Sequence, residues 1–177
     1  MAQGKSVEAQ LAGFLAKYDV EIAAVAELIR GEMRKFYPTA LELVYDNYNA
    51  LVIGFGPTER ATEAIFSIAL YPKWVSLFFL QAKGLPDPDG ILKGSGSVAK
   101  HVVLTSADVL HYPAVRALMQ EAEARAKVAF DPGGEHRLII KSVSAKQRPR
   151  RAVEKDSAGR TGKKSAGTQA SGGVRAR

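Results

Sequence analysis

The first forty positions of the chain show helical periodicity. Ser6 can cap one helix, Asp19 can cap a longer second one, and Pro38 ends the second. The apolar positions of these segments are Val7, Leu11, Phe14, Leu15 and Tyr18, then Ile22, Val25, Ala26, Ile29, Met33, Phe36 and Tyr37. We therefore expect two N-terminal helices, over residues 7–18 and 20–37.

Alternating and β-branched apolar runs follow. Asn47 and Tyr48 separate the first two runs as a tight turn does, and Pro72 and Lys73 separate the next two. The predicted strands are 40–46, 49–55, 63–71, 74–80 and 100–105, and residues 137–143 form a candidate edge strand. A third helix begins at Pro113. Consecutive hairpins and grouped helices predict an α+β fold, with an antiparallel sheet of five to six strands, two N-terminal helices and one C-terminal helix.

The third and fourth predicted strands are apolar on both faces. Alternate residues of the third run are apolar on each side, and nearly every residue of 74–80 is apolar. Such a sheet needs cover on both faces. The first helix, the C-terminal segment, a second copy of the chain in a homodimer, or a ligand can supply that cover.

The net charge of +7 is unevenly distributed. Residues 1–140 contain fourteen basic and sixteen acidic side chains, whereas the chain from Lys141 onward contains eleven Lys and Arg against two acids. Residues 145–177 are rich in Gly, Ser, Ala, Lys and Arg, which predicts a disordered basic tail. Such a tail either binds nucleic acid weakly and without sequence preference or only keeps the protein soluble. The candidate polyanion contacts are Lys146, Arg148, Arg150, Arg151, Lys163 and Lys164.

The chain contains no cysteine, which excludes disulfides, thiolate metal sites and cysteine nucleophiles. The first eighteen residues lack the apolar core of a signal peptide, and no apolar run approaches the length of a membrane span. We therefore expect a soluble, cytoplasmic protein with no membrane partner.

The sequence "KGSGS" at residues 93–97 raises the question of a phosphate site. It precedes a predicted strand rather than a helix, and its residues do not follow the sequence pattern of a phosphate-binding loop. Its glycines are explained more simply by a turn, although a backbone anion nest near Lys93 and Lys100 is the alternative.

Catalytic and metal signatures are weak. The three histidines show no metal-binding spacing, and no serine nucleophile motif occurs. A carboxylate iron site would use Glu21, Glu32, Glu42 and Asp46, but Arg30, Arg34 and Lys35 are interspersed among these acids, as on an ordinary solvated face. We predict no cofactor, and an enzyme is the less favoured interpretation.

Three segments resemble the YdhG-like family, domain of unknown function 1801. They are "AIFSIALYP", "KGSGSV" entering "KHVVL", and "YPAVRALMQEAEAR", and the resemblance covers Ile22 to Lys127. It implies a frataxin-like arrangement of helices packed on a sheet, and an iron-handling role has been proposed for some members. The chain reads "VYDNYN" where members commonly show a Tyr-Gly-Met-Pro-like turn, so that only Tyr45 matches a residue of that turn.

These observations predict an N-terminal helical extension at residues 1–18, a YdhG-like α+β domain at 19–144 and the tail at 145–177. The favoured function is a non-enzymatic binding module for a small ligand or a protein. Iron handling and nucleic-acid association through the tail are the alternatives. The candidate ligand-binding residues are Tyr45, Tyr48, Trp74, Lys93, Gly94, Ser95, Gly96 and Ser97.

Overall fold

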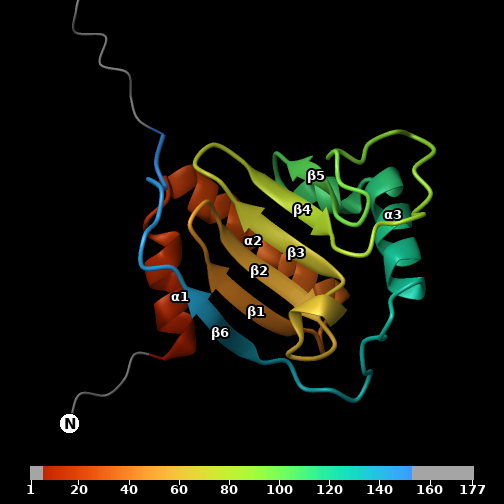
Figure 1. The fold of residues 1–177 in the computed structure, drawn as a ribbon, viewed down its shortest axis with the longest axis horizontal. Coiled ribbons are helices and arrows are strands. Elements are labelled where there is room, and N and C mark those ends of the chain that lie inside the picture. Colours follow the sequence, from red (N-terminus) through yellow and green to blue (C-terminus); the bar gives the residue numbers. More distant parts are fainter. Residues whose placement is uncertain (1–5, 153–177) are drawn as a thin grey trace, which may run out of the picture.

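A computed structural model describes residues 6–152 of the chain. The helices are α1 (Val7–Leu15), α2 (Val20–Phe36) and α3 (Pro113–Ala124), with short 3-10 turns η1 (Ala61–Glu63) and η2 (Ala107–His111). The strands are β1 (Leu41–Asp46), β2 (Leu51–Gly56), β3 (Phe66–Leu70), β4 (Val75–Phe79), β5 (Lys100–Leu104) and β6 (Leu138–Val143). The predicted α+β class, with two N-terminal helices, one C-terminal helix and a six-stranded sheet, is confirmed (Figure 1).

The sheet is mixed rather than wholly antiparallel. Its strand order is β5-β4-β3-β2-β1-β6, in which β1 to β5 pair antiparallel and β6 runs parallel to β1. The strands β6 and β1 therefore begin at the same end of the sheet, where the Glu42 amide donates a hydrogen bond to the Arg137 carbonyl. The predicted edge strand at 137–143 therefore exists, but the expected antiparallel pairing does not hold for it.

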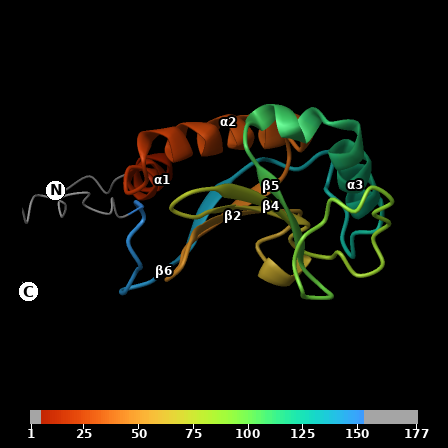
Figure 2. The same ribbon diagram turned by 90° about the horizontal axis from the view of Figure 1, so that it is seen from above.

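The helices α1 and α2 lie on one face of the sheet, and α3 lies beyond one end of its strands (Figure 2). Val44, Ile53, Ile68, Leu77 and Val102 pair in one continuous row across five strands, and each is at most 8% exposed. This row belongs to the same apolar core as Leu11, Ile29 and Met119 of the helices. Strand alternation thus directs one apolar row into the helix layer.

The neighbouring rows point to the opposite face, which no α-helix of the described residues covers. One row is Leu43, Gly54, Ser67, Phe78 and His101, and the other is Tyr45, Val52, Ala69, Ser76 and Val103. We call this surface the helix-free face. Its small central residues are buried, and its aromatic residues are partly exposed. The first helix therefore does not cover this second face of the sheet.

The helix α1 is part of the folded core rather than an extension. Leu11 is fully buried, and Tyr18, which follows α1, is 1% exposed. The Tyr18 hydroxyl accepts a hydrogen bond from the Leu51 amide and donates one to the Leu70 carbonyl, which ties the N-terminal segment to β2 and β3. The core thus extends across the predicted boundary at residue 18.

The C-terminal segment after β6 is also placed against the domain. Residues 144–152, which we call the strap, contain no helix or strand but fold back over the turn between β1 and β2. The predicted disordered tail therefore does not begin at residue 145. Its remaining part, including Lys163 and Lys164, lies outside the described residues. Within residues 6–152, no helix has both the length and the apolar character needed to cross a membrane.

Candidate functional site

The strap is fixed by a buried carboxylate at the end of β1. Asp46 is fully buried, and its two oxygens contact Lys17 at 2.6 Å and Arg150 at 2.8 Å. Arg150 is 5% exposed and also donates to the carbonyls of Asn47 and Tyr48. Arg150, predicted to contact polyanions, is instead part of an internal ion pair because Asp46 is held beneath the turn with no access to water.

Main-chain hydrogen bonds align the strap with the β1–β2 turn. The Ser144 amide donates to the Asp46 carbonyl and the Arg148 amide to the Tyr48 carbonyl, both at 2.9 Å. The Gln147 side chain also reaches the Asp46 carbonyl, at 3.1 Å. These contacts place the two exposed arginines of the strap, Arg148 and Arg151, next to the strand turns.

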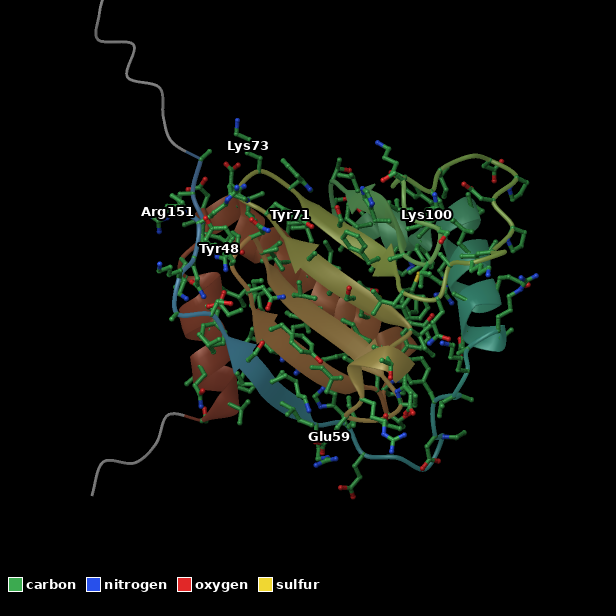
Figure 3. All side chains as sticks on the ribbon, in the orientation of Figure 1. Tyr48, Glu59, Tyr71, Lys73, Lys100 and Arg151 are labelled. Carbon is green, nitrogen blue, oxygen red and sulfur yellow. The ribbon has the colours of Figure 1, made fainter. Side chains whose placement is uncertain are left out.

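The β1–β2 turn and the β3–β4 turn, each with aromatic side chains, lie next to the strap at this end of the sheet (Figure 3). Tyr71 and Trp74 flank the β3–β4 turn and stack with ring centroids 5.1 Å apart and an interplanar angle of 27°. The Arg148 guanidinium lies over the ring of Tyr48, 5.5 Å from its centroid. Trp74 is 45% exposed and Tyr48 is 49% exposed, so that ring surface remains available on both turns.

An open cavity of about 670 Å³ lies between these elements. Its walls include Asn49, Tyr71, Trp74, Arg148, Pro149 and Arg151, and none of the described residues that line it is acidic. We call this cavity and its walls, with the adjoining Tyr48, the aromatic groove. Planar rings and guanidinium groups in one open cavity can bind a ligand that combines flat rings with negative charge.

The predicted ligand-binding residues do not form a single cleft. Trp74 immediately precedes Val75, which pairs with Leu104, whereas Lys100 at the other end of β5 pairs with Phe79. The loop of residues 93–97 leads to Lys100 and therefore lies at the opposite end of these strands from Trp74. The structure brings Tyr48 and Trp74 to the same end and separates the glycine loop from them.

The glycine loop has the features of a turn. Gly94 has a φ of +113°, a conformation that side chains rarely adopt. The Lys100 ammonium donates to the Gly94 carbonyl at 2.6 Å, and Lys93 pairs through its main chain with His101. Burial lowers the pKa of the His101 imidazole, and the nearby Lys93 charge lowers it further.

Tyr45 lies on the helix-free face, away from the turn. Its hydroxyl oxygen is buried and has no hydrogen-bond partner among the described residues, and burial raises the pKa of this hydroxyl. The side chain packs within the sheet surface between β2 and β6. It therefore borders the helix-free face rather than the aromatic groove.

The candidate iron ligands are dispersed and paired with cations. Glu42 is fully buried beside Arg30 at 2.6 Å, Arg34 and His136, and it lies at the opposite end of β1 from Asp46. Glu32 contacts Lys35 and His111, and Glu21 is exposed in the first turn of α2. Within residues 6–152 no group of three or more acidic or histidine side chains is arranged to hold a metal ion.

Sequence reasoning missed Tyr71 and the position of the strap. Tyr71, Pro72, Lys73 and Trp74 form the β3–β4 turn, and the hairpin spacing places both aromatic residues next to that turn. The available signal was the pair of aromatic residues flanking a two-residue turn. What the pattern could not indicate was that Arg148 and Arg151 return to the same place.

Comparisons of the chain with protein-family models, with curated proteins and with solved structures find no match. The resemblance to the YdhG-like family accordingly stays a prediction.

Proposed function

We propose that the protein is a non-enzymatic binding module that holds single-stranded nucleic acid in the aromatic groove. The observation that carries this proposal is the stacked pair Tyr71 and Trp74, placed beside Arg148 and Arg151 in one open cavity whose walls, within residues 6–152, are free of acidic side chains. Exposed aromatic rings stack with unpaired bases, and guanidinium groups bind phosphates.

Two features favour a single strand over a duplex. Stacking on Trp74 requires a base that is not already stacked between neighbours, which a duplex does not offer. The groove is also formed by two turns and the strap and presents no α-helix that could enter a major groove.

The charge along the chain supports the same ligand class. Ala152, the last described residue, lies in the wall of the groove. The sequence that follows it, residues 153–177, has six Lys and Arg against two acids. These basic residues are linked through the chain to the groove wall, and we expect their charge to increase the affinity for a polyanion at low salt.

The chain has a single tryptophan, so its intrinsic fluorescence reports directly on the groove. Titration with the oligonucleotide dT20 should quench this fluorescence, and the DNA duplex of dT20 with dA20 should quench it less. Fluorescence anisotropy of labelled dT20 gives the affinity. Trp74→Ala should weaken binding about 5- to 150-fold, because stacking contributes about 1–3 kcal/mol per base, and Trp74→Phe should retain part of it.

The matched control is Tyr112→Ala. Tyr112 is an aromatic residue with a similar exposed fraction, 54%, and it precedes α3 rather than lying in the groove. This variant should bind dT20 like the wild type. Equal affinity of the Trp74→Ala and Tyr112→Ala variants, or tighter binding of the duplex, would overturn the proposal.

The other functional hypotheses are less well supported. Iron handling requires converging carboxylates, and the candidate acids Glu42 and Asp46 are each paired with basic side chains at opposite ends of β1. Homodimer formation through the sheet is compatible with the helix-free face and stays a prediction, as does the cytoplasmic location.

A further inference from the structure

A second cavity lies at the opposite end of β4 from the aromatic groove, because Leu80 follows this strand and Trp74 precedes it. It has a volume of about 690 Å³ and is formed by η1, the segment after β4, the loop before β5 and the segment after α3. This volume is within the range of small-molecule sites. None of the residues predicted to bind ligand lines it.

The lining has an apolar part and a cationic part. Ala61, Ala64, Leu80 and Val98 contribute apolar surface, and Val98 is 58% exposed despite being aliphatic. Lys83, Arg125 and Lys127 contribute positive charge, and no acidic residue in the described part of the chain lines the cavity. The lining therefore complements a molecule with an apolar body and an anionic head.

Hydrogen bonds between the segments of the wall fix the shape of the cavity. The Gln81 amide donates to the Ala64 carbonyl at 3.2 Å, and its oxygen accepts from the Lys127 main-chain amide at 3.0 Å. This side chain links η1, the segment after β4 and the segment after α3. The three parts of the wall thus have a defined spacing before any ligand binds.

The two lysines differ from the arginine in their partners. Arg125 is already engaged, with its Nε on Glu121 and an Nη on the Gly84 carbonyl. Within the described residues, the ammonium groups of Lys83 and Lys127 form neither an ion pair nor a hydrogen bond. Both are therefore available to neutralise an incoming anion.

We propose that this cavity binds a small amphipathic carboxylate, with its hydrocarbon body against Leu80 and Val98 and its carboxylate between Lys83 and Lys127. Burial of the hydrocarbon supplies most of the affinity, and the two ammonium groups select an anionic head over a neutral or cationic one. This site is independent of the nucleic-acid proposal, because the two cavities share no residue.

The test uses decanoate and isothermal titration calorimetry with the full chain. Decanol and decyltrimethylammonium, which have the same hydrocarbon length, serve as neutral and cationic comparisons. Decanoate should bind at least about tenfold more tightly than either, and the double variant Lys83→Ala/Lys127→Ala should remove this preference. Val98→Ser should weaken decanoate about fivefold through the loss of apolar contact.

The control is Lys141→Ala/Lys146→Ala, which removes the same charge from two exposed lysines elsewhere. It should leave decanoate binding unchanged, and dT20 should still quench Trp74 in the variant Lys83→Ala/Lys127→Ala. Absence of decanoate binding, equal binding of the three amphiphiles, or equal loss in both double variants would each overturn the proposal, and none of these outcomes depends on the aromatic groove.

Discussion

Arg150 and Asp46 form a buried ion pair between positions 104 residues apart in the chain, with a distance of 2.8 Å and side-chain exposures of 3% and 0%. The pair joins the strap to the end of β1 and so positions the cationic wall of the aromatic groove. Lys17 binds the other oxygen of Asp46, which brings the segment after α1 into the same contact.

Arg150→Ala should therefore destabilise the fold. Removing one member of a buried pair leaves a charge without its partner, and we expect a loss of about 3 kcal/mol, the lower end of the usual range, because Lys17 still contacts Asp46. Urea unfolding measures this loss. Arg151→Ala, at a side chain that is 62% exposed, should change the free energy of unfolding by less than about 0.5 kcal/mol. Similar effects of the two substitutions would contradict the role of Arg150.

The ion pair also determines where the basic tail can be removed. A chain ending after Ala152 keeps Arg150 and should unfold with the same free energy as the full chain, whereas a chain ending before Lys146 should lose about 3 kcal/mol. The chain ending after Ala152 should bind dT20 more weakly and with a shallower dependence on salt, because it lacks six basic residues. Fluorescence anisotropy of labelled dT20, measured between about 50 and about 300 mM salt, tests this point. Identical slopes for the two chains would show that the tail does not contact the nucleic acid.

Glu8 should contribute to stability in a pH-dependent way. Burial raises the pKa of its carboxyl, but hydrogen bonds from Arg30 and Arg34 lower it by more, so that the pKa lies below the ordinary value of 4.5. A depressed pKa contributes stability that is fully present above pH 4.5 and is lost as the pH falls through the folded-state pKa.

Glu8→Gln should accordingly lower the free energy of unfolding at pH 7, by about 0.2–1 kcal/mol for a side chain that is largely solvated. The difference between variant and wild type should shrink as the pH is lowered below 4.5. Urea unfolding across this range checks the prediction. A difference that grows toward acid pH would mean that Glu8 is not held in its charged form by the two arginines.

Two glycines of β2 should respond differently to the same substitution. A Cβ on Gly56 would lie 3.0 Å from the Ala64 Cα, a main-chain atom that cannot move away cheaply. A Cβ on Gly54 would meet its nearest atom, the Leu43 carbonyl oxygen, at 3.6 Å, which is ordinary contact. Gly56→Ala should cost about 1–3 kcal/mol, as overpacking does.

Gly54→Ala is the control and should be neutral or stabilising by up to about 1 kcal/mol, since alanine loses less conformational entropy than glycine in a strand. Thermal unfolding of both variants gives the comparison. Equal melting temperatures for the two variants would show that the main chain at Ala64 leaves room for a Cβ atom at position 56.

Replacing Ser76 by alanine should stabilise the protein. Its side chain is fully buried on the helix-free face between Ala69 and Val103, and its hydroxyl has no hydrogen-bond partner among the described residues. An unpaired buried hydroxyl is unfavourable, so Ser76→Ala should raise the free energy of unfolding by about 1 kcal/mol. Urea unfolding tests this, with the exposed Ser142→Ala as the neutral comparison. A loss of stability in Ser76→Ala would indicate that the hydroxyl has a partner in solution, such as a ligand on this face.

The candidate site was only partly predictable. Tyr48 and Trp74 could be identified because each lies at or next to a tight turn, and a turn exposes its aromatic side chains. The sequence could not show that these two residues lie next to Arg148 and Arg151, because that arrangement depends on the direction of β6. The predicted ligand-binding set also includes Lys93 to Ser97, but the antiparallel register of β4 and β5 places that loop at the other end of these strands.

The sequence by itself determined the helices, five of the strands and the apolar row that faces the helices, because each depends on spacing between neighbours in the chain. Only the tertiary structure decided that β6 lies parallel to β1, that Arg150 is internal, and that the strap meets the β3–β4 turn. These contacts join segments as much as 104 residues apart. A buried charge is unfavourable without a partner, and the spacing of neighbours along the chain does not show which distant residue supplies that partner.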